Sequence, residues 1–80
     1  MILLDTNILV YAVKVDDPRH VVSRALIDAV TMGWLYGCVF PQNLLEFYSV
    51  TTNPRRVAGA LSFNEAFAEI SNIRAAFTVV

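Results

Sequence analysis

The sequence is poor in the residues that build several common specialised sites. Its 80 residues include one cysteine, one histidine, three glycines and three prolines. A single cysteine cannot form an internal disulfide, and zinc modules need several Cys and His at close spacing. The glycines form no phosphate-binding loop, and neither a G-x-S-x-G nor an H-E-x-x-H motif occurs. The chain is therefore not a disulfide-stapled scaffold, a zinc module, a P-loop protein or a serine hydrolase of the nucleophile-elbow type.

Charge is also scarce. Only 16% of the residues are charged, and six Lys or Arg against seven Asp or Glu give a net charge of −1. Domains that bind nucleic acid through bulk electrostatics are clearly basic, so any such contact here must depend on a local site. By contrast, 56% of the residues are hydrophobic and the mean hydropathy is +0.54. A domain this small has little interior, and we expect an exposed apolar patch of the kind that contacts a partner.

No segment resembles a signal peptide or a membrane span. The N-terminus has no basic region before its apolar stretch, and Asp5 and Asn7 interrupt that stretch. The uncharged segment 29–45 contains Gly33, Gly37 and Pro41, which indicate turns instead of a spanning helix. We expect a soluble, cytoplasmic protein with no membrane contact.

The order of apolar runs and turn residues predicts one α/β domain with the element order βααβααβ. Strands separated by helices favour a parallel sheet with helical crossovers. The expected strands are residues 1–4, 34–40 and 77–80, and the expected helices are residues 7–14, 19–32, 41–53 and one that begins at Ser62.

Local signals fix some helix ends and suggest which faces are buried. Gly33 is expected to end the second helix, and Ser62 with Glu65 forms a capping box for the fourth. The buried side of the second helix is predicted to hold Val21, Val22, Ala25, Leu26, Ala29 and Val30. That of the fourth helix is predicted to hold Ala66, Phe67, Ile70 and Ile73.

Asp5 is the sharpest candidate for chemistry. It directly follows an apolar strand, and ligands of open parallel sheets bind beyond the carboxyl ends of the strands. A carboxylate in that position suits a hard cation such as Mg²⁺. The alternative is that Asp5 or Asn7 simply caps the following helix. Thr6 and Asn7 could orient the carboxylate or could act only as capping residues.

Glu46 is the second candidate. It belongs to a polar stripe on the third helix, with Gln42, Ser49 and Asn53, in which it is the only charged residue. Because this helix follows a strand, it starts at the same edge of the sheet as Asp5, and the two carboxylates could share a cation. The alternative is an ordinary solvated helix face. Arg55 and Arg56 follow this helix and could contact phosphate, complement the helix dipole or lie in a solvated turn.

The motifs resemble those of the PIN-domain family. Leu3-Leu4-Asp5-Thr6-Asn7 is similar to the opening of these domains, and the segment Pro41 to Arg56 resembles their second motif, which carries an acidic residue on the helix after the second strand. The turn Asp16-Asp17-Pro18-Arg19-His20 is also similar to that of VapC-type toxins of toxin–antitoxin pairs. The resemblance runs through the whole chain in order.

The resemblance implies a three-layer fold, a parallel sheet with helices on both faces, and a ribonuclease dependent on Mg²⁺ or Mn²⁺. Asp5 and Glu46 would be catalytic, metal-binding carboxylates, with Thr6 and Asn7 beside them and Arg55 and Arg56 on the RNA. The family uses further acidic residues after the third strand, so residues 1–80 are expected to be a partial domain that binds the metal weakly. Its implied partners are RNA and an antitoxin protein.

Other functions remain open. Residues 2–4 would form an unpaired sheet edge, and with the apolar composition this favours a non-catalytic module that self-associates or binds a partner. A strand followed by Asp also occurs in aspartate-nucleophile phosphatases, but the second Asp expected there is Asn7 in this chain.

Overall fold

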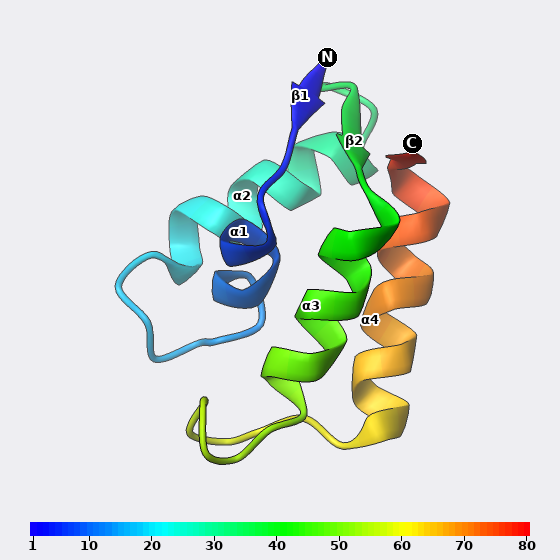
Figure 1. Ribbon diagram of the computed structural model, residues 1–80. Helices are drawn as coiled ribbons and strands as arrows, with labels where there is room; N and C mark the ends of the chain where they lie inside the picture. Colours follow the sequence, from blue (N-terminus) through cyan, green and yellow to red (C-terminus); the bar gives the residue numbers. More distant parts are fainter.

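The computed structural model describes all 80 residues, Met1–Val80. The chain forms a small α/β unit in the predicted order βααβααβ (Figure 1). The strands are β1 (Ile2–Leu3), β2 (Gly37–Val39) and β3 (Thr78–Val79). The helices are α1 (Thr6–Tyr11), α2 (His20–Thr31), α3 (Pro41–Thr51) and α4 (Phe63–Ala76).

The sheet is entirely parallel and has the strand order β1-β2-β3. Leu3 is the register partner of Cys38, and Cys38 that of Thr78. Strand β1 pairs only with β2, which confirms the predicted free edge. Parallel strands must be joined by long crossovers, and each crossover here is a pair of helices.

The residues predicted to end α2 and to begin α3 and α4 do so, although the strands are shorter than predicted. Gly33 has a φ of +81° just after α2, a left-handed conformation that glycine adopts without steric cost. Pro41 is the first residue of α3. At α4 the Glu65 N–H donates to Ser62 Oγ at 3.1 Å, and the Ser62 N–H donates to Glu65 Oε1 at 2.9 Å. These bonds form the predicted capping box.

One hydrophobic core joins the sheet to all four helices. Phe47 of α3 and Val39 of β2 are completely buried, and they pack in a cluster with Leu4, Leu9, Val10, Ala12, Ile27, Val30, Ile73 and Phe77. At Gly37 a Cβ atom would lie 2.6 Å from the Phe77 ring and 2.9 Å from Val30. The close approach of the Phe77 ring to β2 therefore requires glycine at this position.

The predicted buried face of α2 is partly wrong. Val21 and Val22 are each 75% exposed, and Ala25 is exposed too. The core-facing residues are Ser23, Ile27 and Val30. The α2 sequence carries two adjacent apolar stripes, and packing against α1 and the common core selects the one that contains Ile27.

The buried face of α4 was predicted correctly except at one residue. Ala66 and Ile73 are buried and Ile70 is half-buried, but Phe67 is 66% exposed. Phe67 lies at a surface groove between α3 and α4.

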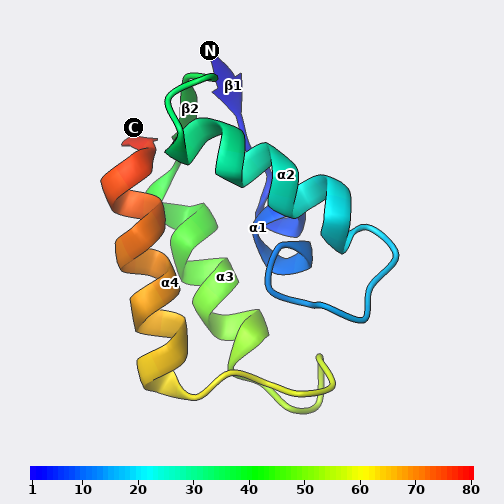
Figure 2. The same ribbon diagram turned by 180° about the vertical axis from the view of Figure 1, so that it is seen from behind.

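Helices cover only one face of the sheet. Helix α2 crosses in front of β1 and β2 in Figure 2, whereas nothing lies in front of these strands in the opposite view of Figure 1. The register partners Leu3, Cys38 and Thr78 point to the uncovered side. The expectation of helices on both faces is therefore not met within these residues.

The turn between α1 and α2 is organised by Asp17. Its carboxylate accepts hydrogen bonds from the Arg19 backbone N–H at 2.8 Å and from Arg19 Nε at 2.9 Å. The hydrogen bond from the Arg19 side chain is the main reason that the pKa of Asp17 falls from 3.8 to about 2. The Arg19 guanidinium in turn lies 3.9 Å from the centre of the Tyr11 ring. Asp17 thus orders the approach to α2, although Arg19 is the residue at the helix cap.

None of the helices is long and apolar enough to cross a membrane.

Candidate active site

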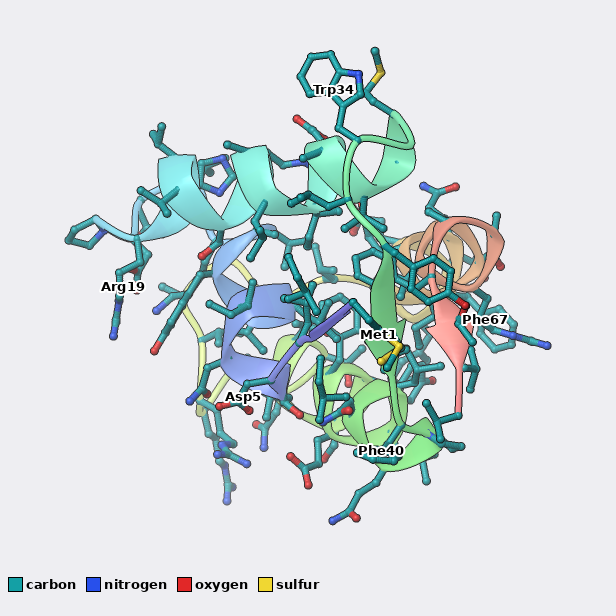
Figure 3. All side chains as sticks on the ribbon, turned by 90° about the horizontal axis from the view of Figure 1, so that it is seen from above. Met1, Asp5, Arg19, Trp34, Phe40 and Phe67 are labelled. Atoms are coloured by element: carbon teal, nitrogen blue, oxygen red, sulfur yellow. The ribbon has the colours of Figure 1, made fainter.

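The two predicted carboxylates lie at the same surface hollow. This hollow, the Asp5–Glu46 hollow, has a volume of about 320 Å³ and is lined by Asp5, Thr6, Asn7, Val10, Glu46, Ser49, Val50 and Arg56. Asp5 comes from the end of β1 and Glu46 from the second turn of α3. Helices α1 and α3 pack against each other beyond the carboxyl ends of β1 and β2, and this packing brings together residues far apart in the sequence. Asp5 lies on the solvent side of α1 in Figure 3.

A hydrogen-bond network fixes the Glu46 carboxylate. The Thr6 hydroxyl donates to Glu46 Oε2 at 3.0 Å, and Gln42 Nε2 donates to Glu46 Oε1 at 3.1 Å. Thr6 is itself held, because Asn43 Nδ2 donates to its hydroxyl oxygen at 3.1 Å. The other end of the Asn43 amide accepts the Phe40 N–H at 2.8 Å, at the start of α3. The network therefore ties the position of Glu46 to the beginning of both helices.

Asp5 is arranged differently. It occupies the residue before α1, but its side chain makes no capping hydrogen bond. The three ion pairs of the molecule all lie in the turn before α2 or on α2 itself and do not include Asp5. Asp5 is therefore the N-cap residue of α1 by position, but its carboxylate takes no part in the cap, and this exposed group remains available to a ligand. Thr6 was expected either to orient Asp5 or to act only as a capping residue, but its hydroxyl contacts Glu46 instead.

Arg55 and Arg56 differ in their position relative to the Asp5–Glu46 hollow. Arg56 lines the Asp5–Glu46 hollow, whereas Arg55 does not. Asn53 shapes this turn, since its side-chain oxygen accepts the Arg55 N–H at 3.0 Å and its carbonyl accepts the Arg56 N–H, also at 3.0 Å. Arg56 is therefore the only basic residue that lines the hollow.

The polar atoms of the hollow suit a hard cation in type. The side-chain acceptor atoms are carboxylate, hydroxyl and amide oxygens, with no sulfur or imidazole, and Arg56 adds one guanidinium group to the lining. Mg²⁺ is commonly held by only one or two protein carboxylates together with water and substrate phosphate. No group of three or more His, Cys, Asp or Glu residues is close enough to form a metal cage of its own. The donor set of Asp5 and Glu46 therefore fits an ion that is held weakly and shared with a substrate.

Asn43 is the functional residue that the sequence interpretation missed. It was overlooked because it lies beside the polar stripe of α3 and not within it. Its place as the third residue of a helix that opens with proline was the available signal, because side chains there often bond back to the residue before the helix. Ser49, by contrast, was included in the predicted stripe and does line the hollow.

Comparison with models of protein families and with curated proteins found no match to this chain.

Proposed function

We propose that the Asp5–Glu46 hollow is the active site of a ribonuclease that depends on Mg²⁺ or Mn²⁺ and belongs to the PIN-like, VapC toxin type. The substrate would be an RNA phosphodiester, and the natural partner of the protein would be an antitoxin. The motifs around Asp5 and Glu46 suggest this family.

The observation that supports the proposal most directly is the shared hollow of Asp5 and Glu46. Two carboxylates that serve only as solvated surface residues have no reason to meet beyond the ends of neighbouring strands, where ligands of parallel sheets bind. The buried hydroxyl of Thr6, which donates to Glu46 Oε2 at 3.0 Å, adds to the argument. An exposed glutamate with a purely solubilising role needs no such support.

Each residue has a proposed task in the reaction. Asp5 and Glu46 hold the divalent ion, which when bound activates water and stabilises the charge that develops on the phosphodiester. Thr6 and Gln42 keep Glu46 in one orientation, while Asn43 keeps Thr6 in place. Asn7 borders the same hollow and can hydrogen-bond to the substrate. Arg56 offsets the negative charge of the carboxylates and contacts an RNA phosphate. Arg55, which does not line the hollow, adds only to the positive electrostatic potential that attracts RNA.

Cleavage of end-labelled single-stranded RNA in the presence of Mg²⁺ or Mn²⁺ tests the proposal. The expected result is slow cleavage that stops on chelation and is lost in Asp5→Asn and Glu46→Gln. Thr6→Val should lower the rate about 10–100-fold, as is typical for residues that orient a metal ligand.

Asp28→Asn is the matched control. Asp28 is an exposed carboxylate on α2, paired with Arg24 at 3.1 Å, and it does not line the hollow. This variant changes the net charge as Asp5→Asn does and should cleave like the unaltered protein. RNA cleavage that persists in Asp5→Asn, or that ignores the chelator, contradicts the proposal.

A second candidate function is a non-catalytic interaction module. It is favoured by the number of large apolar side chains left exposed, among them Trp34 at 77% and Leu45 at 72%. This candidate predicts a folded protein that associates with itself or a partner yet shows no metal-dependent cleavage. The same RNA assay, read together with the molecular mass in solution, separates the two candidates.

A further inference from the structure

A second cavity lies next to the Asp5–Glu46 hollow. It has a volume of about 280 Å³ and is walled by α1 with the turn that follows it, the last residue of α3 and the loop between α3 and α4. This loop lies below α1 in both Figure 1 and Figure 2. We call this space the Lys14 cavity, and its main lining residues are Val10, Val13, Lys14, Asp16, Val57 and Leu61.

The cavity and the hollow adjoin each other at three points of the chain. Val10 of α1 lines both of them. Val50 lines the hollow and the next residue, Thr51, lines the cavity. Arg56 and Val57 are divided in the same way. A flexible ligand held in the hollow is therefore within reach of the cavity.

The walls of the cavity are largely apolar, but several polar groups around it are free. The Asp16 carboxylate takes part in none of the three ion pairs. The Lys14 ammonium lies 4.0 Å from the Asp17 carboxylate, which is too far for a hydrogen bond. The N–H groups of Ala58 and Gly59 donate to no backbone carbonyl. The cavity thus combines apolar walls with one acceptor group and three donor groups.

We propose that the Lys14 cavity binds a nucleobase of the RNA strand whose phosphate lies in the Asp5–Glu46 hollow. This inference rests on the proposed ribonuclease function and adds a second contact with the same substrate. A nucleobase has apolar faces and an edge of donors and acceptors, and the cavity offers a partner for each. Proteins that recognise single-stranded RNA commonly bind bases that have left the stack.

The size of the cavity agrees with one base. Pockets for small molecules begin at about 300 Å³, and the Lys14 cavity, at about 280 Å³, is close to that lower limit. It has room for one ring system and not for a helix of a partner protein, which is at least about 10 Å wide. A base attached to a phosphate in the hollow is therefore the occupant that both the size and the position of the cavity favour.

Each free group has a proposed partner on the base. Val13 and Leu61 contact its faces, and Lys14 with the N–H groups of the loop donates to its ring nitrogen or carbonyl acceptors. Asp16 accepts a hydrogen bond from an amino group of the base, as carboxylates do with cytosine. Adenine, cytosine and guanine carry such a group, whereas uracil does not. The cavity should therefore prefer a base with an amino group.

An NMR titration with adenosine 5′-monophosphate in the presence of Mg²⁺ tests the proposal. Ribose 5-phosphate is the matched probe without a base, and neither compound contains a phosphodiester that could be cleaved. We expect the nucleotide to shift the backbone amide signals of Asp5 and Asn7 at the hollow and of Lys14 and Gly59 at the cavity. Ribose 5-phosphate should shift only the signals of the hollow.

Two leucine substitutions make the test specific. Ala58→Leu fills the cavity from an exposed loop residue, and Ala25→Leu adds the same side chain to the exposed surface of α2, away from the residues that line the cavity. Ala58→Leu should weaken nucleotide binding about tenfold, the effect of losing contact with one base, and leave ribose 5-phosphate unaffected. Ala25→Leu should bind both probes as the unaltered protein does. Asp16→Ala replaces Ala58→Leu if circular dichroism shows that the latter is unfolded, and it should also weaken only the nucleotide.

The outcomes distinguish this inference from the proposed function. If the nucleotide causes no shifts at the cavity, or if Ala58→Leu binds it as tightly as the unaltered protein does, the base site is overturned whatever the RNA cleavage assay shows. Shifts at both the hollow and the cavity, weakened in Ala58→Leu, support the base site. If these shifts occur but no metal-dependent RNA cleavage is found, the proposed ribonuclease activity alone is contradicted.

Discussion

Replacing Thr6 by valine should weaken the link between α1 and α3 that holds Glu46. Thr6 is 6% exposed, and its hydroxyl both donates to Glu46 at 3.0 Å and accepts from Asn43 at 3.1 Å. Valine keeps the shape, so the change removes two hydrogen bonds without opening a cavity. A hydrogen bond to a charged group contributes about 1.5–3 kcal/mol, and because Glu46 is exposed, water recovers part of that. We expect the free energy of unfolding to fall by about 1–2 kcal/mol.

Urea denaturation at neutral pH measures this loss, with Thr52→Val as the control. The Thr52 hydroxyl donates to the Tyr48 carbonyl at 2.7 Å, but that carbonyl also accepts the Thr52 N–H, so it keeps a partner after the substitution. The control should change stability by no more than about 0.5 kcal/mol. Combining Thr6→Val with Glu46→Ala should reveal a coupling free energy of about 1 kcal/mol. Equal losses in Thr6→Val and Thr52→Val, with no coupling, refute the reasoning.

Three further predictions concern the fold. Phe47→Ala should lower the free energy of unfolding by about 3–5 kcal/mol in urea denaturation, since the ring is completely buried; a loss under about 1 kcal/mol contradicts the core described here. Gly37→Ala should lower the free energy of unfolding by about 1–3 kcal/mol, because its Cβ would lie 2.6 Å from the Phe77 ring. A melting temperature equal to that of the unaltered protein counts against that contact. Asp17 has a pKa lowered from 3.8 to about 2, so its contribution to stability is present above pH 3.8 and is lost as the pH falls towards 2. In Asp17→Asn the melting temperature should therefore fall less on acidification than in the unaltered protein. The same pH dependence in both proteins contradicts the role assigned to the contact between Asp17 and Arg19.

Element order, the end of α2 and the start of α4 could be predicted because their signals are local, whereas α1 ends at Tyr11 and not at the predicted Lys14. Gly33 needs a left-handed conformation, and Ser62 with Glu65 satisfies the first backbone groups of α4 wherever that helix packs. The buried face of α2 could not be predicted in the same way. Val21 and Ile27 belong to neighbouring apolar stripes on one helix, and only contact with the rest of the protein decides which is buried.

The meeting of Asp5 and Glu46 at one hollow could be predicted, but the contacts around them could not. The sequence indicated that Asp5 and Glu46 meet, because each follows a strand of one parallel sheet. It did not indicate that Thr6 bonds to Glu46 and not to Asp5, or that Asn43 holds Thr6. Those contacts depend on how α1 and α3 cross, which is set by side-chain packing.

The central claim is that Asp5 and Glu46 together bind a hard divalent ion. Paramagnetic line broadening by substoichiometric Mn²⁺ in NMR spectra of the backbone amides tests it most directly. We predict selective broadening at Asp5, Thr6, Asn7 and Glu46 that disappears in Asp5→Asn and persists in Asp28→Asn. Broadening centred on the Asp16–Asp17 turn, or broadening at the hollow that Asp5→Asn leaves unchanged, would contradict the account.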